Sequence, residues 1–215
     1  MNIDLSSLKN RLSKTPTIIG RDRFFNSSVL VPFVEISGEY HLLFQKRAKS
    51  IRQGNEICFP GGKFDKKVDK CYQCTAIRET IEEIGIDRNK IEVLGSLGTL
   101  ISPMAVAIDA YLALFKSIDD LSINSEEVER VFTVPLSFFI NNPPEEYHAK
   151  IEASSSYINS EGNRVTLLPV KKLGLPDRYL NSWGSQTHRV LVYKTEEEVI
   201  WGLTAEIINE LITLI

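Results

Sequence analysis

The chain has few of the features that mark disulfide-bonded, secreted or membrane proteins. It contains three cysteines among 215 residues, and this odd, small number predicts reduced thiols rather than a disulfide framework. No apolar run approaches the roughly 20 residues that a membrane span needs. The first residues, Met-Asn-Ile-Asp-Leu-Ser-Ser, lack the charged-then-apolar build of a secretory signal. A cytoplasmic protein without membrane contact is therefore expected.

An excess of positive charge is also absent. The chain has 25 Lys and Arg against 28 Asp and Glu, a net charge of −3. No basic stripe is available to release phosphate counterions, which argues against a general nucleic-acid binder. Local arginines remain compatible with one small anionic substrate. With 43% hydrophobic residues, the chain can bury the core of a single domain over residues 1–215.

Two of the cysteines, Cys71 and Cys74, form a Cys-x-x-Cys pair. A structural zinc site needs four ligands, and the remaining candidates are scattered along the chain: Cys58, His41, His148 and His188. The sequence therefore predicts neither a metal-binding nor a redox role for this pair.

What the chain does have is a helix with one strongly acidic face. At about 100° per residue, Glu79, Glu82 and Glu83 lie together, opposite a face of isoleucines. The like charges of Glu79 and Glu83 at i and i+4 destabilise a helix by about 0.2–0.5 kcal/mol. A hard divalent cation such as Mg²⁺ prefers such oxygen ligands. A merely solvated acidic face is the alternative.

The residues before this helix favour a binding site. An apolar run ends at Phe59, and Pro60 and two glycines follow it. Gly61 and Gly62 form a turn whose backbone can approach a ligand closely. Residues 63–70 then form a loop, Asp69 is a candidate N-cap, and Gly85 is a candidate C-terminal cap of the helix.

This strand, Gly-Gly loop and Arg-Glu-x-x-Glu-Glu-x-Gly helix resemble the box of the Nudix hydrolases, here at about residues 61–86. The family cleaves a diphosphate linked to another moiety. The resemblance implies an α/β fold, an αβα sandwich around a central mixed sheet. It also implies Mg²⁺ or Mn²⁺ as cofactor, with ligands from Glu79, Glu82, Glu83 and the carbonyl of Gly61. Arg78 would orient the carboxylates.

Two features depart from the family pattern. Gly62 and Arg78 are sixteen steps apart, whereas the box usually has fourteen. The usual early glutamate is also missing. Lys70 stands at its position, and Asp65 and Asp69 are nearby substitutes. A longer loop in front of an intact metal-binding helix is the expected result.

Residues 42–52 resemble the signature that precedes the box in coenzyme A diphosphatases. Coenzyme A carries a 3′-phosphate besides its diphosphate, and guanidinium groups bind phosphate oxygens in a bidentate way. Arg47 and Arg52 are therefore the candidate substrate-binding residues, together with the backbone of Gly62. The alternative is a basic loop that balances an acidic protein, which is the expected role of Lys46 and Lys49.

Two later segments support the same subfamily. Residues 126–139 are similar to a block that follows the box, and Val199 to Ala205 ends in its Trp-Gly-Leu-Thr-Ala. Glu127 matches a glutamate that supplies an extra metal ligand or the general base in several Nudix enzymes. Glu126 and Glu129 could compete for this role, and a solvated loop acid is the alternative.

The expected function is metal-dependent hydrolysis of coenzyme A or its thioesters to 3′,5′-ADP and a 4′-phosphopantetheine derivative. Glu82, Glu127 and Arg78 are the expected catalytic residues. ADP-ribose, NADH or dinucleoside polyphosphates are rival substrates, because the box recognises the diphosphate and not its attachments. A nucleotide-binding Nudix module without activity is the rival of another class.

Hydrophobic periodicity gives a coarse outline of the elements. Strand patterns cover residues 28–36, 40–46, 91–100, 105–116 and 131–134, and a short helix follows at 136–140. Helical spacing of leucine and isoleucine predicts helices over residues 1–14 and 203–215 that cover the sheet. A homodimer surface is the alternative for the last helix.

Residues 145–215 form a subfamily-type C-terminal extension, and residues 145–190 are the part of it whose pattern is least informative. They contain aromatic side chains among Gly, Pro and Ser. Such a segment could cap the adenine or pantetheine end of a substrate, because aromatic rings stack on bases. A variable surface loop is the alternative.

Overall fold

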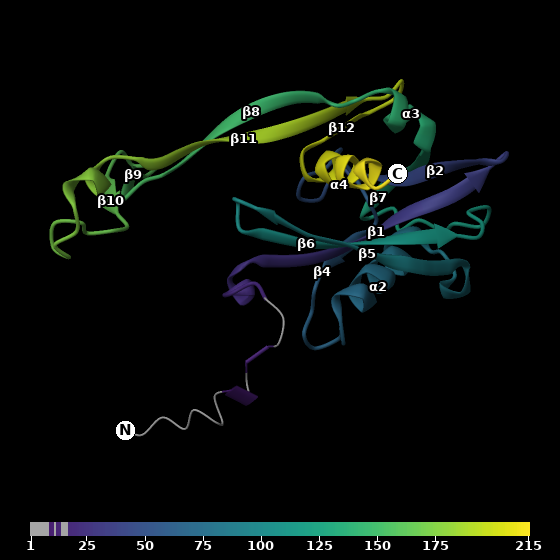
Figure 1. Ribbon diagram of the computed structural model, residues 1–215, viewed down its shortest axis with the longest axis horizontal. Helices are drawn as coiled ribbons and strands as arrows, with labels where there is room; N and C mark the ends of the chain where they lie inside the picture. Colours follow the sequence, from purple (N-terminus) through teal and green to yellow (C-terminus); the bar gives the residue numbers. More distant parts are fainter. Residues whose placement is uncertain (1–8, 11, 14–16) are drawn as a thin grey trace. The chain divides into compact units, whose positions relative to one another are not determined.

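The computed structural model describes residues 9–10, 12–13 and 17–215 (Figure 1). These residues fall into two compact units. The first contains the described residues up to Asn55 together with Phe59–Thr133, and the second contains Glu56–Cys58 and Val134–Ile215. The predicted helix over residues 1–14 lies mostly outside the described residues.

The first unit is built on a mixed sheet. Its strands are β1 (Phe25–Ile36), β2 (Glu39–Arg47), β4 (Gly61–Lys63), β5 (Ile91–Ser102), β6 (Val106–Phe115) and β7 (Val128–Pro135). The central order is β2-β1-β6-β5, while β4 pairs with β1 and β7 with β2. The long β1 and β6 run parallel, whereas β1–β2, β1–β4 and β5–β6 are antiparallel. The predicted strands and the mixed α/β class are confirmed.

Helix α2 (Tyr72–Ile84) packs on this sheet through its apolar side. Ala76 and Ile84 are fully buried and join a core cluster with Leu30 of β1, Leu43 of β2 and Phe115 of β6. Burial of large apolar side chains such as these contributes about 1.5–3 kcal/mol each. This packing determines which way the remaining face of α2 points.

The ends of α2 differ in part from the prediction. Gly85 ends the helix at φ 67°, in the left-handed region, as expected. Asp69 is not the N-cap, because Cys71 caps the helix and its Sγ accepts from the Cys74 N–H. Cys71 and Cys74 are disulfide-bonded, so the prediction of reduced thiols is wrong for this pair. Cys71 at the cap and Cys74 in the first turn have their Cα atoms 5.1 Å apart, which is within the range that a disulfide spans.

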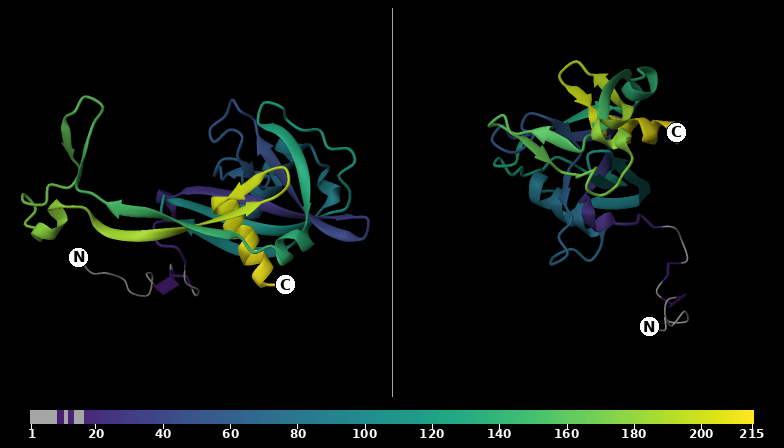
Figure 2. Two further views of the ribbon diagram at one scale, coloured as in Figure 1. Left: turned by 90° about the horizontal axis from the view of Figure 1, so that it is seen from above. Right: turned by 90° about the vertical axis from the view of Figure 1, so that its left-hand side faces the viewer.

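The second unit contains a three-stranded antiparallel sheet and two helices. The elements are β3 (Ile57–Cys58), α3 (Leu136–Asn141), β8 (Glu145–Ala153), β9 (Ser156–Ile158), β10 (Arg164–Thr166), β11 (Trp183–Lys194), β12 (Val199–Trp201) and α4 (Gly202–Thr213). The sheet order is β12-β11-β8. Figure 2 shows β8 and β11 as a long two-stranded ribbon that leads to the β9–β10 hairpin.

Helix α4 lies where the sequence predicts the C-terminal helix. It packs against β11 and β12 and buries Ala205, Ile208 and Leu211. Thr204 Oγ1 donates to the carbonyl of Ile57 at 3.2 Å. Short 3-10 helices occur at Arg21–Arg23, Arg88–Lys90 and Asp177–Leu180. Among the described residues, no helix is both long and apolar enough to cross a bilayer.

Candidate metal and catalytic site

The three glutamates on the polar face of α2 differ in their exposure to solvent. The Glu82 side chain is 56% exposed and that of Glu79 is 18% exposed, but Glu83 is buried. The Oε2 atom of Glu83 accepts from the Gly61 N–H at 2.8 Å. Strand β4 and α2 thereby meet at this carboxylate, because Gly61 begins the strand.

Burial dominates the electrostatics of Glu83. It raises the pKa of this carboxyl to about 7, since a charge is less stable away from water. The Gly61 N–H, the nearby Gln45 amide and the charge of Arg47 act in the opposite direction, and the Glu79 charge adds to the rise. A neighbouring cation would favour the ionised form strongly.

Burial also raises the pKa of Glu79. The Arg78 guanidinium lowers it, while the charges of Glu82 and Glu127 raise it further. The structure therefore brings Glu127, which is distant in sequence, close to the carboxylates of α2. Clustered carboxylates of this kind are stabilised by a bound cation.

The two glycines of the turn have no side chains, and neighbouring groups occupy the space where their Cβ atoms would lie. A Cβ atom at Gly62 would lie 2.4 Å from the carboxyl carbon of Glu79. Gly61 has φ +149°, and a Cβ there would lie 2.2 Å from the carbonyl oxygen of Ser28. Side chains at these positions would displace Glu79 or the β1–β4 pairing.

Arg78 connects the carboxylates. Its Nη1 lies 2.8 Å from Glu79 Oε1 and donates to Glu82 Oε2 at 2.8 Å. Its Nε and Nη2 donate to the two oxygens of Asp69, both at 2.9 Å. This bidentate pair holds the pKa of the buried Asp69 well below its usual range. Of the three residues considered for the missing glutamate, Asp69 is the one that pairs with Arg78, whereas Asp65 and Lys70 are exposed.

The segment that carries Glu127 is anchored by its backbone. The Asn124 N–H donates to the carbonyl of Glu83 at 2.8 Å, and the carbonyl of Glu127 accepts from the Ala48 N–H at 2.8 Å. These bonds join the end of α2 to the end of β2 through residues 124–127. Glu129 instead lies 3.8 Å from Lys46 Nζ.

The two candidate arginines are placed differently. Arg47, at the end of β2, lies close enough for its charge to lower the pKa of Glu83. Its Nε donates to the carbonyl of Arg52 at 3.3 Å. Arg52 is exposed, and no contact within the described residues ties it to the carboxylates. The structure thus brings Arg47 to the site, whereas Arg52 contacts Arg47 through its backbone carbonyl.

Comparison with known proteins identifies the family. The NUDIX domain matches residues 25–153 of the chain. The chain belongs to the Nudix family. Nudix hydrolase 3 of Caenorhabditis elegans is 30% identical over 216 residues, which cover 94% of this chain and 79% of the relative.

Two further relatives of this Nudix protein match over shorter stretches. The peroxisomal coenzyme A diphosphatase NUDT7 of Mus musculus is 34% identical over 124 residues, 57% of this chain and 51% of the relative. The mitochondrial coenzyme A diphosphatase NUDT8 of Homo sapiens is 34% identical over 131 residues, 59% of this chain and 55% of the relative. The chain spans about half the length of these two relatives.

The donor set of this Nudix site fits a hard divalent cation, because it consists of carboxylate oxygens and a glycine turn that leaves Glu79 room. In the described part of the chain, no three acidic, His or Cys side chains converge closely enough to hold an ion as they stand. The reason is visible at Arg78, which holds Glu79 and Glu82. Arg78 contacts Oε1 of Glu79 and Oε2 of Glu82, so the other oxygen of each carboxylate is not held by its guanidinium.

Sequence reasoning missed Gln45 as part of the site. This β2 residue is fully buried, and both polar atoms of its amide lack a hydrogen-bond partner among the described residues. The amide lies near Glu83 and favours its ionised form. The signal in the sequence was a polar residue directly after the apolar Leu42-Leu43-Phe44.

Proposed function

We propose that this Nudix protein hydrolyses the diphosphate of coenzyme A or acyl-coenzyme A, with Mg²⁺ or Mn²⁺, to 3′,5′-ADP and 4′-phosphopantetheine or its acyl derivative. The gathering of Glu79, Glu82, Glu83 and Glu127 beside the glycine turn supports diphosphate hydrolysis. The charge of Arg47 near Glu83 supports a substrate that carries phosphate oxygens. The two coenzyme A diphosphatases among the relatives point to the same substrate.

In this proposal the chain supplies ligands, orientation and a base. Glu79, Glu82 and Glu83 would hold the metal ions, with the carbonyl of Gly61 as a further ligand. When bound, such ions neutralise diphosphate oxygens and lower the pKa of a coordinated water. Glu127 accepts the proton of the attacking water, since it is exposed and its charge acts on Glu79.

Other residues position these groups. Arg78 keeps Glu79 and Glu82 on one side of α2, and Asp69 holds Arg78. Gly62 lets the backbone of the turn approach Glu79 without a side chain between them. Arg47 binds the 3′-phosphate through its guanidinium, and Arg52 assists from the following loop.

The first test is a substrate panel with purified protein and Mg²⁺ or Mn²⁺. Coenzyme A, dephospho-coenzyme A, ADP-ribose, NADH and diadenosine polyphosphates are compared by kcat/KM, and products are identified by mass. We expect 3′,5′-ADP from coenzyme A at the highest kcat/KM. A higher value for another substrate would reject the coenzyme A assignment. Binding without turnover across the panel would favour a nucleotide-binding module instead.

Arg47→Gln tests the phosphate contact, with Lys49→Gln, two residues after it in the loop that follows β2, as the control. Loss of a charge-assisted hydrogen bond should lower kcat/KM for coenzyme A about tenfold or more. The same change should affect dephospho-coenzyme A less, because this substrate lacks the 3′-phosphate. Equal losses on both substrates would show that Arg47 does not recognise that group.

Glu127→Gln tests the general base, with Glu126→Gln as the neighbouring control. We expect kcat to fall by about 10²-fold or more for Glu127→Gln and to stay near the wild-type value for Glu126→Gln. An unchanged kcat for Glu127→Gln would remove this residue from the proposed mechanism.

A further inference from the structure

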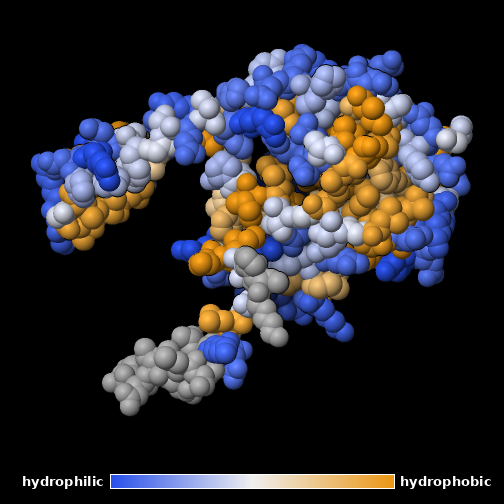
Figure 3. All heavy atoms as spheres, viewed as in Figure 1, coloured by the Kyte–Doolittle hydropathy of each residue, from blue (hydrophilic) through white to orange (hydrophobic). Residues whose placement is uncertain are grey.

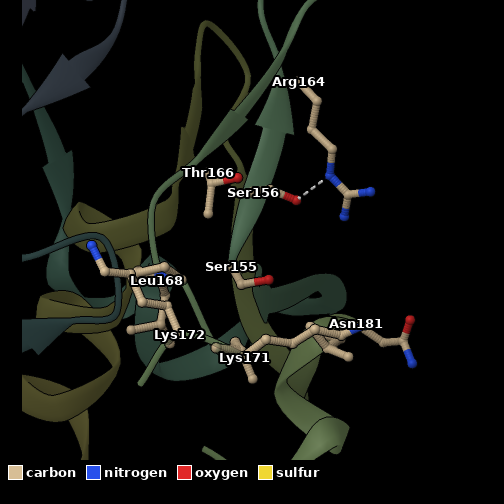
Figure 4. Close-up of a pocket in the computed structure, with 11 residues that line it drawn as sticks. Ser155, Ser156, Arg164, Thr166, Leu168, Lys171, Lys172 and Asn181 are labelled. Atoms are coloured by element: carbon tan, nitrogen blue, oxygen red, sulfur yellow. Dashed lines mark hydrogen bonds between the residues drawn. The ribbon is translucent and has the colours of Figure 1, made fainter. Parts of the chain in front are cut away.

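The second unit contains a pocket that lies outside the carboxylate site. It forms at the end of the β8–β11 ribbon and has a volume of about 640 Å³. Polar and charged side chains make up most of its lining: Ser155, Ser156, Arg164, Thr166, Lys171, Lys172 and Asn181. Figure 4 shows these residues around the pocket.

Backbone hydrogen bonds join two of the segments that line this pocket. The carbonyl of Ser155, just before β9, accepts from the N–H groups of Leu167 and Leu168, just after β10. The loop that follows closes on itself, since the Leu175 N–H donates to the carbonyl of Val170 at 3.0 Å. Val170 is buried at 2% exposure. The pocket wall is therefore held by local structure of the second unit alone.

The charge of the pocket is all of one sign. Arg164, Lys171 and Lys172 line it, and no carboxylate does. None of these three cations forms an ion pair with a carboxylate in the described residues. Three like charges around one opening repel one another, and a bound anion would relieve this repulsion.

Unused hydrogen-bond donors face the same space. Ser155 is only 5% exposed, yet its hydroxyl bonds no other group in the described part of the chain. The Nε of Arg164 donates to Ser156 Oγ at 3.0 Å, which leaves both terminal nitrogens of the guanidinium without a described partner. In Figure 4 the hydroxyls of Ser155 and Ser156 point to the same side, between Arg164 and Asn181. A phosphate has the oxygens that such donors need.

The pocket also has an apolar wall made of Leu168, Pro169, Val170 and Leu180. At this end of the ribbon Figure 3 shows hydrophilic residues along one side and hydrophobic residues along the other. The volume exceeds what a phosphate ion alone would fill. A ligand with both a phosphate and an uncharged organic part matches the two walls.

We propose that this pocket binds a small phosphate monoester. Its phosphate lies between Arg164 and Lys171 and accepts from the Ser155 hydroxyl, and its organic part contacts the Leu168–Val170 wall. The site is additional to the proposed hydrolysis and does not depend on it. Two compounds can present such a phosphate group: inorganic phosphate itself, or a nucleotide such as 3′,5′-ADP. The experiment distinguishes between them.

The test is an NMR titration of the full-length ¹⁵N-labelled protein in EDTA, with inorganic phosphate and, separately, 3′,5′-ADP at constant ionic strength. Amide shifts at residues 155–156, 168 and 170–172 should saturate with a Kd below about 10 mM. Arg164→Gln should weaken this binding about tenfold, since it removes charge-assisted hydrogen bonds. Lys150→Gln is the matched control, because Lys150 is exposed on the same ribbon and pairs with Glu152. It should change the Kd less than about twofold.

Tighter binding of 3′,5′-ADP than of inorganic phosphate would support an organic phosphate as the ligand. Comparable binding of the two would support the phosphate contacts and reject the role of the apolar wall. Two results would overturn the proposal. One is the absence of saturable shifts at residues 155–172 with either compound. The other is an equal loss of affinity in Arg164→Gln and Lys150→Gln, which would indicate unspecific attraction.

Discussion

At the scale of single residues, Glu83 is where stability and the proposed function conflict. Its helical position groups it with Glu79 and Glu82, yet the fold buries it against β4 and raises its pKa to about 7. A carboxylate kept in such a place without a cation destabilises the folded state. The same burial makes it a strong ligand once a cation neutralises it.

Glu83→Gln should therefore stabilise the metal-free protein. The folded pKa exceeds the ordinary value of 4.5, so the native state binds the extra proton. Stability from this group is present below pH 4.5 and is lost as the pH rises through about 7. Since Gln cannot ionise, the variant should be more stable than wild type by up to about 3 kcal/mol at pH 8. The difference should vanish at pH 4.5.

Urea unfolding in EDTA at the two pH values measures this difference, with the exposed Glu82→Gln as control. The control should show no comparable gain at pH 8. Both variants should lose hydrolytic activity. A Glu83→Gln protein that is less stable than wild type at pH 8 would show that the buried carboxylate does not destabilise the metal-free fold.

Gly62→Ala tests the space beside Glu79. The added Cβ meets the carboxyl end of a flexible side chain at 2.4 Å, so the fold should persist while Glu79 moves. We expect kcat/KM to fall at least about tenfold with little change in the melting temperature. Gly95→Ala on β5 is the control, because nothing lies within 4 Å of its added Cβ. Retained activity in Gly62→Ala would separate this glycine from the site.

At the scale of elements, α2 is held by two different kinds of contact. Its apolar side packs into the core of the first unit through Ala76 and Ile84. Its polar side is tied through Arg78 to Asp69, in the loop before the helix. The loop is longer than the family pattern, and this ion pair connects its end to the middle of the helix.

Asp69→Asn should loosen that connection. The Asp69 pKa is lowered by Arg78, so its contribution to stability is present above the ordinary value of 3.8 and is lost only as the pH falls further. We expect a loss of about 2 kcal/mol near pH 7, and this loss should shrink below pH 4. Thermal unfolding at pH 7 and pH 3 measures it. Asp65→Asn, which changes an exposed neighbour, should cost less than about 0.5 kcal/mol.

At the scale of the whole molecule, two compact units share one chain that passes between them more than once. Glu56–Cys58 belong to the second unit, although the segments on both sides belong to the first. The NUDIX match over residues 25–153 also extends through parts of both units. We therefore propose that residues 1–215 unfold as one domain, with residues 145–215 as an extension of it.

Both tryptophans, Trp183 and Trp201, lie in the second unit, whereas the carboxylates lie in the first. If the chain unfolds cooperatively, saturating Mg²⁺ should raise the tryptophan-fluorescence transition together with the far-UV circular dichroism transition. At one hundred times the Kd the gain is about 2.7 kcal/mol. Glu82→Gln should remove it. A metal-induced shift of the circular dichroism transition alone would mean that the units unfold separately.

Local residue patterns sufficed for much of this protein. Periodicity located the long strands of the first unit, α2 and α4, and Gly85 marked the end of α2. It did not predict strands β8 to β12 in residues 145–201. The same patterns did not predict Cys71 as the cap, because the choice between Asp69 and Cys71 depends on what else Asp69 can bind. The Asp69 carboxylate accepts two hydrogen bonds from Arg78, nine residues away. The Cys71–Cys74 disulfide likewise depends on where the helix begins.

The order of the amino acids is enough to place Glu79, Glu82 and Glu83 on one helix face after a glycine turn, because helix periodicity and turn-forming glycines act over a few residues. The resemblance of this pattern to the Nudix box is also a property of the sequence alone. Tertiary folding was needed to bury Glu83 and expose Glu82, and to bring the charges of Glu127 and Arg47 near α2. It was also needed to place Ser155 in one pocket with Arg164, Lys171 and Lys172. Burial and neighbouring charge set these properties. Both are produced by segments that are distant in sequence and meet only in the folded chain.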